Sequence, residues 1–152
     1  MANSKTIKFI AKGWITKGDN EINPFNKFIC YWISFNCFYS VKTGIRNDTN
    51  ALEALCKDYS ITQSYKSIIC SSNIALFDNL KSICPIERVG TAKLKSISSV
   101  LNFKQVISVL YLIRCNLFHG DKGESAKRDL LVVRAANPVL ELIVKKLVSI
   151  HL

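Results

Sequence analysis

Apolar residues recur at helical spacing over much of the chain, most clearly after Pro24. Between Pro24 and Ser40 they lie at the i, i+3, i+4, i+7 positions of one helical face, which predicts a helix over this range. Pro24 suits the first helical turn, where its missing N–H costs nothing. Asn36 falls on the apolar stripe. Because a buried amide must be hydrogen-bonded, we expect Asn36 to brace a neighbouring helix or a loop.

Two further long helices are predicted in the second half of the chain. Asn102 is a candidate N-cap, with Gln105 in the place of a capping-box partner, and the helix should run from Phe103 to about Phe118. Gly120 follows where a left-handed cap is expected. The last helix is predicted from Ala126 to about Val148, with Ser125 as its cap. The pair at 137–138, Asn-Pro, indicates either a kink or a fresh helix start.

Shorter segments complete an all-α pattern. The polar run 47–50 favours a short helix through about Tyr59, and two more helices are predicted over 62–70 and 72–84, where Pro85 ends the second. Residues 86–99 are weakly patterned and indicate an exposed connection, and no segment reads as a strand pair. Residues 1–20 form an N-terminal extension of uncertain structure. We therefore expect one compact all-α bundle over 1–152, with about five to six helices and two long helices flanking a polar loop.

The composition narrows the class of protein. A length of 152 residues suits one domain with a sizeable core, and 49% hydrophobic residues excludes disorder. Six glycines and three prolines are too few for a sandwich or barrel. The strongly apolar segment Phe28–Tyr39 is too short to span a bilayer, and the N-terminus does not resemble a signal peptide. We expect a soluble cytoplasmic protein without membrane contact.

Cysteine usage and charge add two constraints. The six cysteines include no C-x-x-C pair and the chain has two histidines, which argues against a structural zinc site and fits a reducing compartment. The net charge of +10 is spread along the chain, so the folded surface should attract polyanions. Charge alone does not separate RNA from DNA or from an acidic protein.

The segment Leu110–Asp121 carries the candidate chemistry. An apolar run ends in Arg114, Asn116 and His119. Arginine can clamp a phosphate with two parallel hydrogen bonds, and histidine exchanges a proton near neutral pH, so the combination predicts phosphodiester chemistry without a metal.

The spacing within this segment leaves two arrangements open. On a straight helix Asn116 and His119 can be neighbours, whereas Arg114 and His119 are separated by roughly 140° of rotation. Either the last turn unwinds near Gly120, or a second copy of the chain completes the site.

The residues Ile113-Arg114-Cys115-Asn116-Leu117-Phe118-His119-Gly120 resemble the signature of the HEPN superfamily, the higher eukaryotes and prokaryotes nucleotide-binding domains. The aromatic segment Phe28–Tyr39 is similar to the first helix of prokaryotic members, and the resemblance covers about residues 20 to 150. It implies a small all-α bundle acting as a metal-independent ribonuclease without a cofactor. It also implies a homodimer with a composite active site, often a toxin or anti-phage effector with an antitoxin or defence-system partner protein.

Residue by residue, the resemblance assigns Arg114 to the scissile phosphate and His119 to proton transfer as the RNA 2′-hydroxyl attacks it. The products would be a 2′,3′-cyclic phosphate and a 5′-hydroxyl. Many members have a polar residue directly after the arginine. Here Cys115 stands there, and we expect Asn116 to take part of that role.

Three cations beyond the motif are predicted to contact the RNA backbone without reading its sequence, namely Lys122, Lys127 and Arg128. Because some relatives are inert modules, the alternative function is a non-catalytic domain that binds RNA, a nucleotide or a partner protein.

Overall fold

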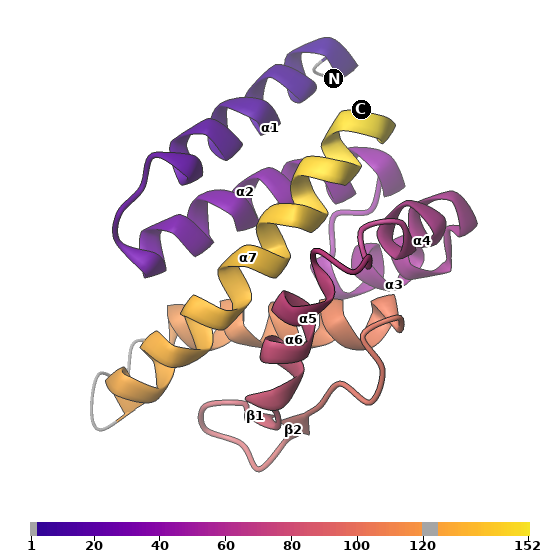
Figure 1. Ribbon diagram of the computed structural model, residues 1–152. Coiled ribbons are helices and arrows are strands. Elements are labelled where there is room, and N and C mark those ends of the chain that lie inside the picture. The colour runs from indigo at the N-terminus through magenta and orange to yellow at the C-terminus, as the bar shows by residue number, and fades with distance from the viewer. Residues whose placement is uncertain (1–2, 120–124) are drawn as a thin grey trace.

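The computed structural model describes residues 3–119 and 125–152, which form seven α-helices and one short β-hairpin (Figure 1). The predicted all-α bundle is confirmed. In chain order the elements are α1 (Ser4–Asp19), α2 (Pro24–Thr43), α3 (Asp48–Lys57), α4 (Tyr59–Lys66), α5 (Ile74–Ser82), β1 (Ile86–Glu87), β2 (Leu94–Lys95), α6 (Phe103–Phe118) and α7 (Ser125–His151).

Residues 4–19, which the sequence left unassigned, form helix α1 packed along α2 (Figure 1). The Asn3 side chain caps α1 by accepting a hydrogen bond from the Lys5 N–H at 3.1 Å. The buried Ser34 hydroxyl donates to the Ala11 carbonyl at 2.8 Å. Since α1 buries only a narrow strip of small and apolar residues, its own pattern was too weak to predict it.

Helix α2 is the centre of the core rather than a helix with one buried face. Phe28, Tyr31, Phe35, Phe38 and Tyr39 have no exposed surface, and they point to several sides of the helix. A helix that is apolar on most of its circumference belongs inside a domain. Helices α1, α3, α6 and α7 all contact α2, and they cover it on these sides (Figure 1).

The two long C-terminal helices begin and end close to the predicted positions. Asn102 caps α6 by accepting from the Gln105 N–H at 3.1 Å. The expected capping box is wrong, because the Gln105 Oε1 atom accepts from the N–H and hydroxyl groups of Ser98 and the N–H of Ser99 instead. Gly120, the predicted C-terminal cap, lies outside the described residues.

Helix α7 runs through Asn137 and Pro138 as one element, so no fresh helix starts there. Pro138 lacks the N–H that would bond to the Arg134 carbonyl. The Asn137 Nδ2 atom donates to the Pro24 carbonyl at 2.9 Å and thereby joins the middle of α7 to the start of α2.

The region predicted as a plain connection after Pro85 contains an antiparallel hairpin, which is a correction. Ile86 pairs with Lys95 and Glu87 with Leu94, and the Arg88 N–H donates to the Lys93 carbonyl at 2.9 Å. Ile86 is buried and anchors the hairpin to the core, a long-range contact that local sequence does not reveal.

The short helices are shifted from their predicted ranges. Helix α4 begins at Tyr59 because Asp58 caps it, accepting from the Ile61 N–H at 3.2 Å, and α5 begins only at Ile74. Within 3–119 and 125–152, no helix is long and apolar enough to cross a membrane.

Candidate functional site

Arg114 lies on the face of α6 that meets α2 and α3. Its side chain is 32% exposed, and one terminal nitrogen lies 3.9 Å from the Asp48 Oδ2 atom. The guanidinium also lies over two rings of its own helix, 5.9 Å from the centre of Tyr111 and 5.0 Å from that of Phe118. These residues are three and four positions away, so they share one face of α6 with Arg114.

Asp48 is fixed in place by two side chains of α2. The Tyr39 hydroxyl donates to the Asp48 Oδ1 atom at 2.9 Å, and the Asn36 Nδ2 atom donates to the same oxygen at 3.2 Å. Asn36 also donates to the Tyr39 hydroxyl at 2.6 Å, and burial raises the pKa of Tyr39. The expectation that Asn36 braces a neighbouring helix is confirmed, because Asp48 begins α3.

The hydrogen-bonding capacity of Arg114 is incompletely used by the described residues. Its Nε atom is buried and has no hydrogen-bond partner among them. The 3.9 Å approach to Asp48 brings the charges together but is longer than a hydrogen bond. A partly exposed guanidinium whose terminal nitrogens make no hydrogen bond with the described residues is suited to a bidentate anion such as a phosphate.

His119 follows the last residue of α6, and it is exposed. Its backbone stays right-handed, with φ −83° and ψ −8°, and its N–H donates to the Asn116 carbonyl at 3.2 Å. The helix therefore does not unwind before His119. Arg114 and His119 leave the helix in directions about 140° apart, roughly 7.5 Å apart along its axis, and the fold does not bring them together within one face.

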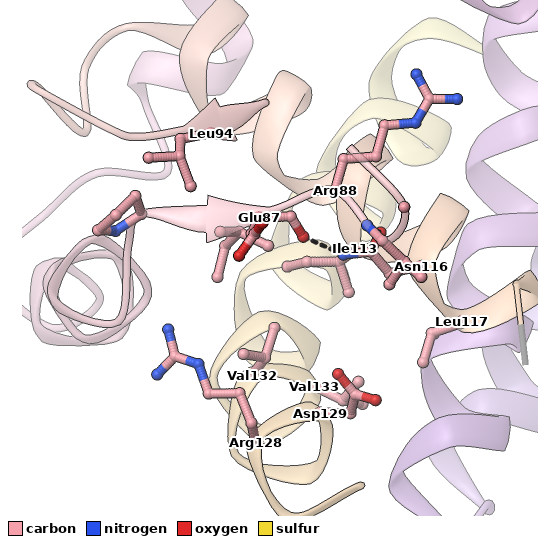
Figure 2. Close-up of a pocket in the computed structure, with 14 residues that line it drawn as sticks. Glu87, Arg88, Leu94, Ile113, Asn116, Leu117, Arg128, Asp129, Val132 and Val133 are labelled. Atoms are coloured by element: carbon pink, nitrogen blue, oxygen red, sulfur yellow. Dashed lines mark hydrogen bonds between the residues drawn. The ribbon is translucent and has the colours of Figure 1, made fainter. Parts of the chain in front are cut away.

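Asn116 points to the hairpin rather than to Arg114. Its Nδ2 atom donates to the Glu87 carbonyl at 2.9 Å, and its Oδ1 atom accepts from the Val89 N–H at 3.0 Å (Figure 2). Two positions along a helix correspond to about 200° of rotation, so the amide lies on the far side of α6 from the guanidinium. The catalytic role predicted for Asn116 is not tested by this, but its amide already has partners in the fold.

A pocket of about 500 Å³ lies between the hairpin, the second half of α6 and the first turns of α7 (Figure 2). Its apolar lining includes Ile113, Leu117 and Val133. This pocket could not be predicted from local sequence patterns, because it depends on the hairpin.

The charged side chains that line the pocket among the described residues are Glu87, Arg88, Arg128 and Asp129. One Arg128 terminal nitrogen donates to the Ile83 carbonyl at 2.8 Å, so this side chain holds the end of α5. Figure 2 shows the Arg88 side chain extending away from the pocket.

The remaining predicted RNA contacts lie near the start of α7. Lys127 is exposed there, one residue before Arg128. Lys122 lies outside the described residues. Among the described residues, no group of three or more histidine, cysteine or acidic side chains gathers where a metal ion could bind.

Comparison with family models, with curated proteins and with solved structures gives no match for this chain.

Proposed function

We propose that this chain is an endoribonuclease of the HEPN type, which cleaves single-stranded or loop RNA without a metal ion. The observation that carries the proposal is the state of Arg114: its side chain is 32% exposed, and among the described residues its terminal nitrogens have an ion pair with Asp48 at 3.9 Å but no hydrogen bond. It lies about one and a half turns before the exposed His119. The net charge of +10 supports a polyanionic substrate.

The reaction follows from what these two groups can do. The RNA 2′-hydroxyl loses its proton to a base and attacks the adjacent phosphorus, and the 5′-oxygen leaves and takes up a proton. A 2′,3′-cyclic phosphate and a 5′-hydroxyl end result. His119 is the proton-transfer group, and Arg114 binds the phosphate and stabilises the extra negative charge of the transition state.

A dimer explains how two side chains on different sides of α6 act on one phosphate. In a twofold dimer, the guanidinium of one chain can face the imidazole of the other. Phe118, which is 62% exposed between these two groups, offers apolar surface for such an interface.

Such an enzyme fits a toxin or an anti-phage effector restrained by a partner protein. If so, its expression should slow growth of the host, and Arg114→Ala should relieve the effect.

The decisive test is cleavage of labelled single-stranded RNA in the presence of EDTA. We expect the wild-type protein to leave 2′,3′-cyclic phosphate ends. The cleavage rate of His119→Ala should be lower by at least about 100-fold, as when a general acid–base group is removed. The other histidine provides the matched control, so His151→Gln should cleave at the wild-type rate. Cleavage that requires magnesium, or that is equal in His119→Ala, would refute the proposal.

Mixing the two inactive variants tests the composite site. In a dimer of one Arg114→Ala chain and one His119→Ala chain, one of the two sites has both groups intact. Random exchange should therefore restore about a quarter of the wild-type rate. No recovery, with exchange of subunits demonstrated, would show that each site lies within one chain.

Two observations favour the second candidate, a non-catalytic module that binds RNA, a nucleotide or a partner protein. Arg114 already lies against Asp48, and Cys115 occupies the position next to it. For such a module, RNA would stay intact while binding weakens steeply with salt.

A further inference from the structure

The hairpin of β1 and β2 carries three cations on one face. Ile86 is opposite Lys95, and the hydrogen bond from the Arg88 N–H to the Lys93 carbonyl continues the pairing by one step. Because alternate residues in a strand point to the same side, Arg88, Lys93 and Lys95 share the face of Ile86. Glu87 and Leu94 lie on the other face.

This arrangement is unfavourable for the hairpin itself. Like charges directly opposite each other destabilise a strand pair, and a two-stranded hairpin has little stability of its own. Among the ion pairs of the described residues, none involves these three cations. All three side chains are exposed, so the fold does not need them for its core.

Asn116 holds this cationic face beside the reactive end of α6. Its amide bonds to the backbone at Glu87 and Val89, the residues on either side of Arg88. Asn116 also precedes His119 by three residues, about 4.5 Å along the helix axis. A strand of RNA bound at His119 therefore passes close to the hairpin.

We propose that the hairpin 86–95 is an RNA-binding element of this protein, and that Arg88, Lys93 and Lys95 bind phosphates of single-stranded RNA next to the cleaved linkage. The inference deepens the proposed function and rests on RNA being the ligand. Asn116 acts as a positioning residue that fixes the hairpin on α6. The pocket between the hairpin, α6 and α7 is not the phosphate site, since the Arg128 side chain that lines it is bonded to the Ile83 carbonyl and two acidic side chains, Glu87 and Asp129, also line it.

The test measures RNA binding separately from cleavage. The probe is a fluorescein-labelled 2′-O-methyl RNA of mixed sequence, which cannot be cleaved by 2′-hydroxyl attack. A hairpin variant replaces its three cations with glutamine. The control variant removes the same charge from exposed lysines of α1 and α4, away from the hairpin (Figure 1). The substitutions are Arg88→Gln, Lys93→Gln and Lys95→Gln for the hairpin, and Lys5→Gln, Lys12→Gln and Lys66→Gln for the control.

Each lost phosphate contact lowers the slope of log affinity against log salt by about 0.7 for single strands. The hairpin variant should therefore lose about two units of slope, and bind roughly 10- to 100-fold more weakly at 0.1 M salt. The control variant should keep the wild-type slope. Equal effects in both variants, no effect in either, or no binding by the wild-type protein would overturn the inference.

Parallel cleavage assays with unmodified RNA separate this inference from the proposed function. If the wild-type protein binds through the hairpin but leaves RNA intact, the ribonuclease proposal fails and the hairpin assignment stands. If both triple variants cleave RNA at the wild-type rate at low substrate concentration, the hairpin assignment fails and the ribonuclease proposal stands.

Discussion

Replacing Asn116 with alanine should release the hairpin from α6 without unfolding the domain. The substitution removes two hydrogen bonds, to the Glu87 carbonyl and from the Val89 N–H. Each is worth about 0.5–1.5 kcal/mol net. Because both bonds lie near the surface, water can replace the lost partner, and we expect a total loss of about 1–2 kcal/mol. The hairpin then keeps only its short ladder and the buried Ile86 as anchors.

Amide hydrogen exchange measures this loss at single residues. The protection factor of the Val89 N–H should fall by about 5- to 30-fold, which corresponds to 1–2 kcal/mol. The Arg88 N–H should lose protection as well, because Asn116 attaches the paired strands of the hairpin to α6.

Gln105→Ala is the matched control, since this side-chain amide also accepts backbone N–H groups, at the other end of α6. It should free the amides of Ser98 and Ser99 and leave the hairpin unchanged. Unchanged protection at Val89 in Asn116→Ala would refute the reasoning, and a loss confined to Val89 would show that Asn116 does not position the hairpin.

Two further predictions concern stability. A Cβ atom on Gly18 would lie 2.7 Å from a ring carbon of Tyr31, so Gly18→Ala should cost about 1–3 kcal/mol in urea unfolding, whereas Gly13→Ala meets nothing and should stabilise by about 0.5–1 kcal/mol. Equal effects would show that α1 does not pack closely on α2. Burial, assisted by the charge of Lys42, lowers the pKa of His151 below its ordinary 6.5, so the unfolded chain binds the proton more readily. The free energy of unfolding contributed by neutral His151 is therefore fully present above about pH 6.5 and is lost as the pH falls towards the lowered pKa of the folded protein. Urea unfolding midpoints of the wild type and of His151→Gln, measured against pH, should differ in this range. Identical pH profiles for the two proteins would contradict the prediction.

Local patterns were sufficient wherever an element carries its own signals. Helix α6 matches its predicted range because a capping asparagine and a largely apolar helical segment are both local features. Helix α2 was predicted from its start at Pro24, although its end and the breadth of its buried surface were not. Helix α1 was missed because its few buried residues gain their meaning only from the neighbouring α2.

The residues of the candidate site could also be predicted from local sequence, whereas their surroundings could not. The sequence alone supplied the candidate pair, Arg114 and His119, together with the basic charge that suggests a polyanion. It also supplied the helical rotation that keeps these two side chains apart within one chain, because that rotation depends only on spacing.

Only the tertiary structure decided what surrounds them. The guanidinium of Arg114 meets Asp48, and the amide of Asn116 meets a hairpin 27 and 29 residues earlier in the chain. Contacts of this kind join segments that are distant in the sequence and have weak local patterns. Their contribution to the free energy of folding depends on the partner residue, which local periodicity does not specify. For that reason the sequence alone supplied the candidate groups, whereas the fold determined that the amide of Asn116 bonds to the hairpin backbone at Glu87 and Val89.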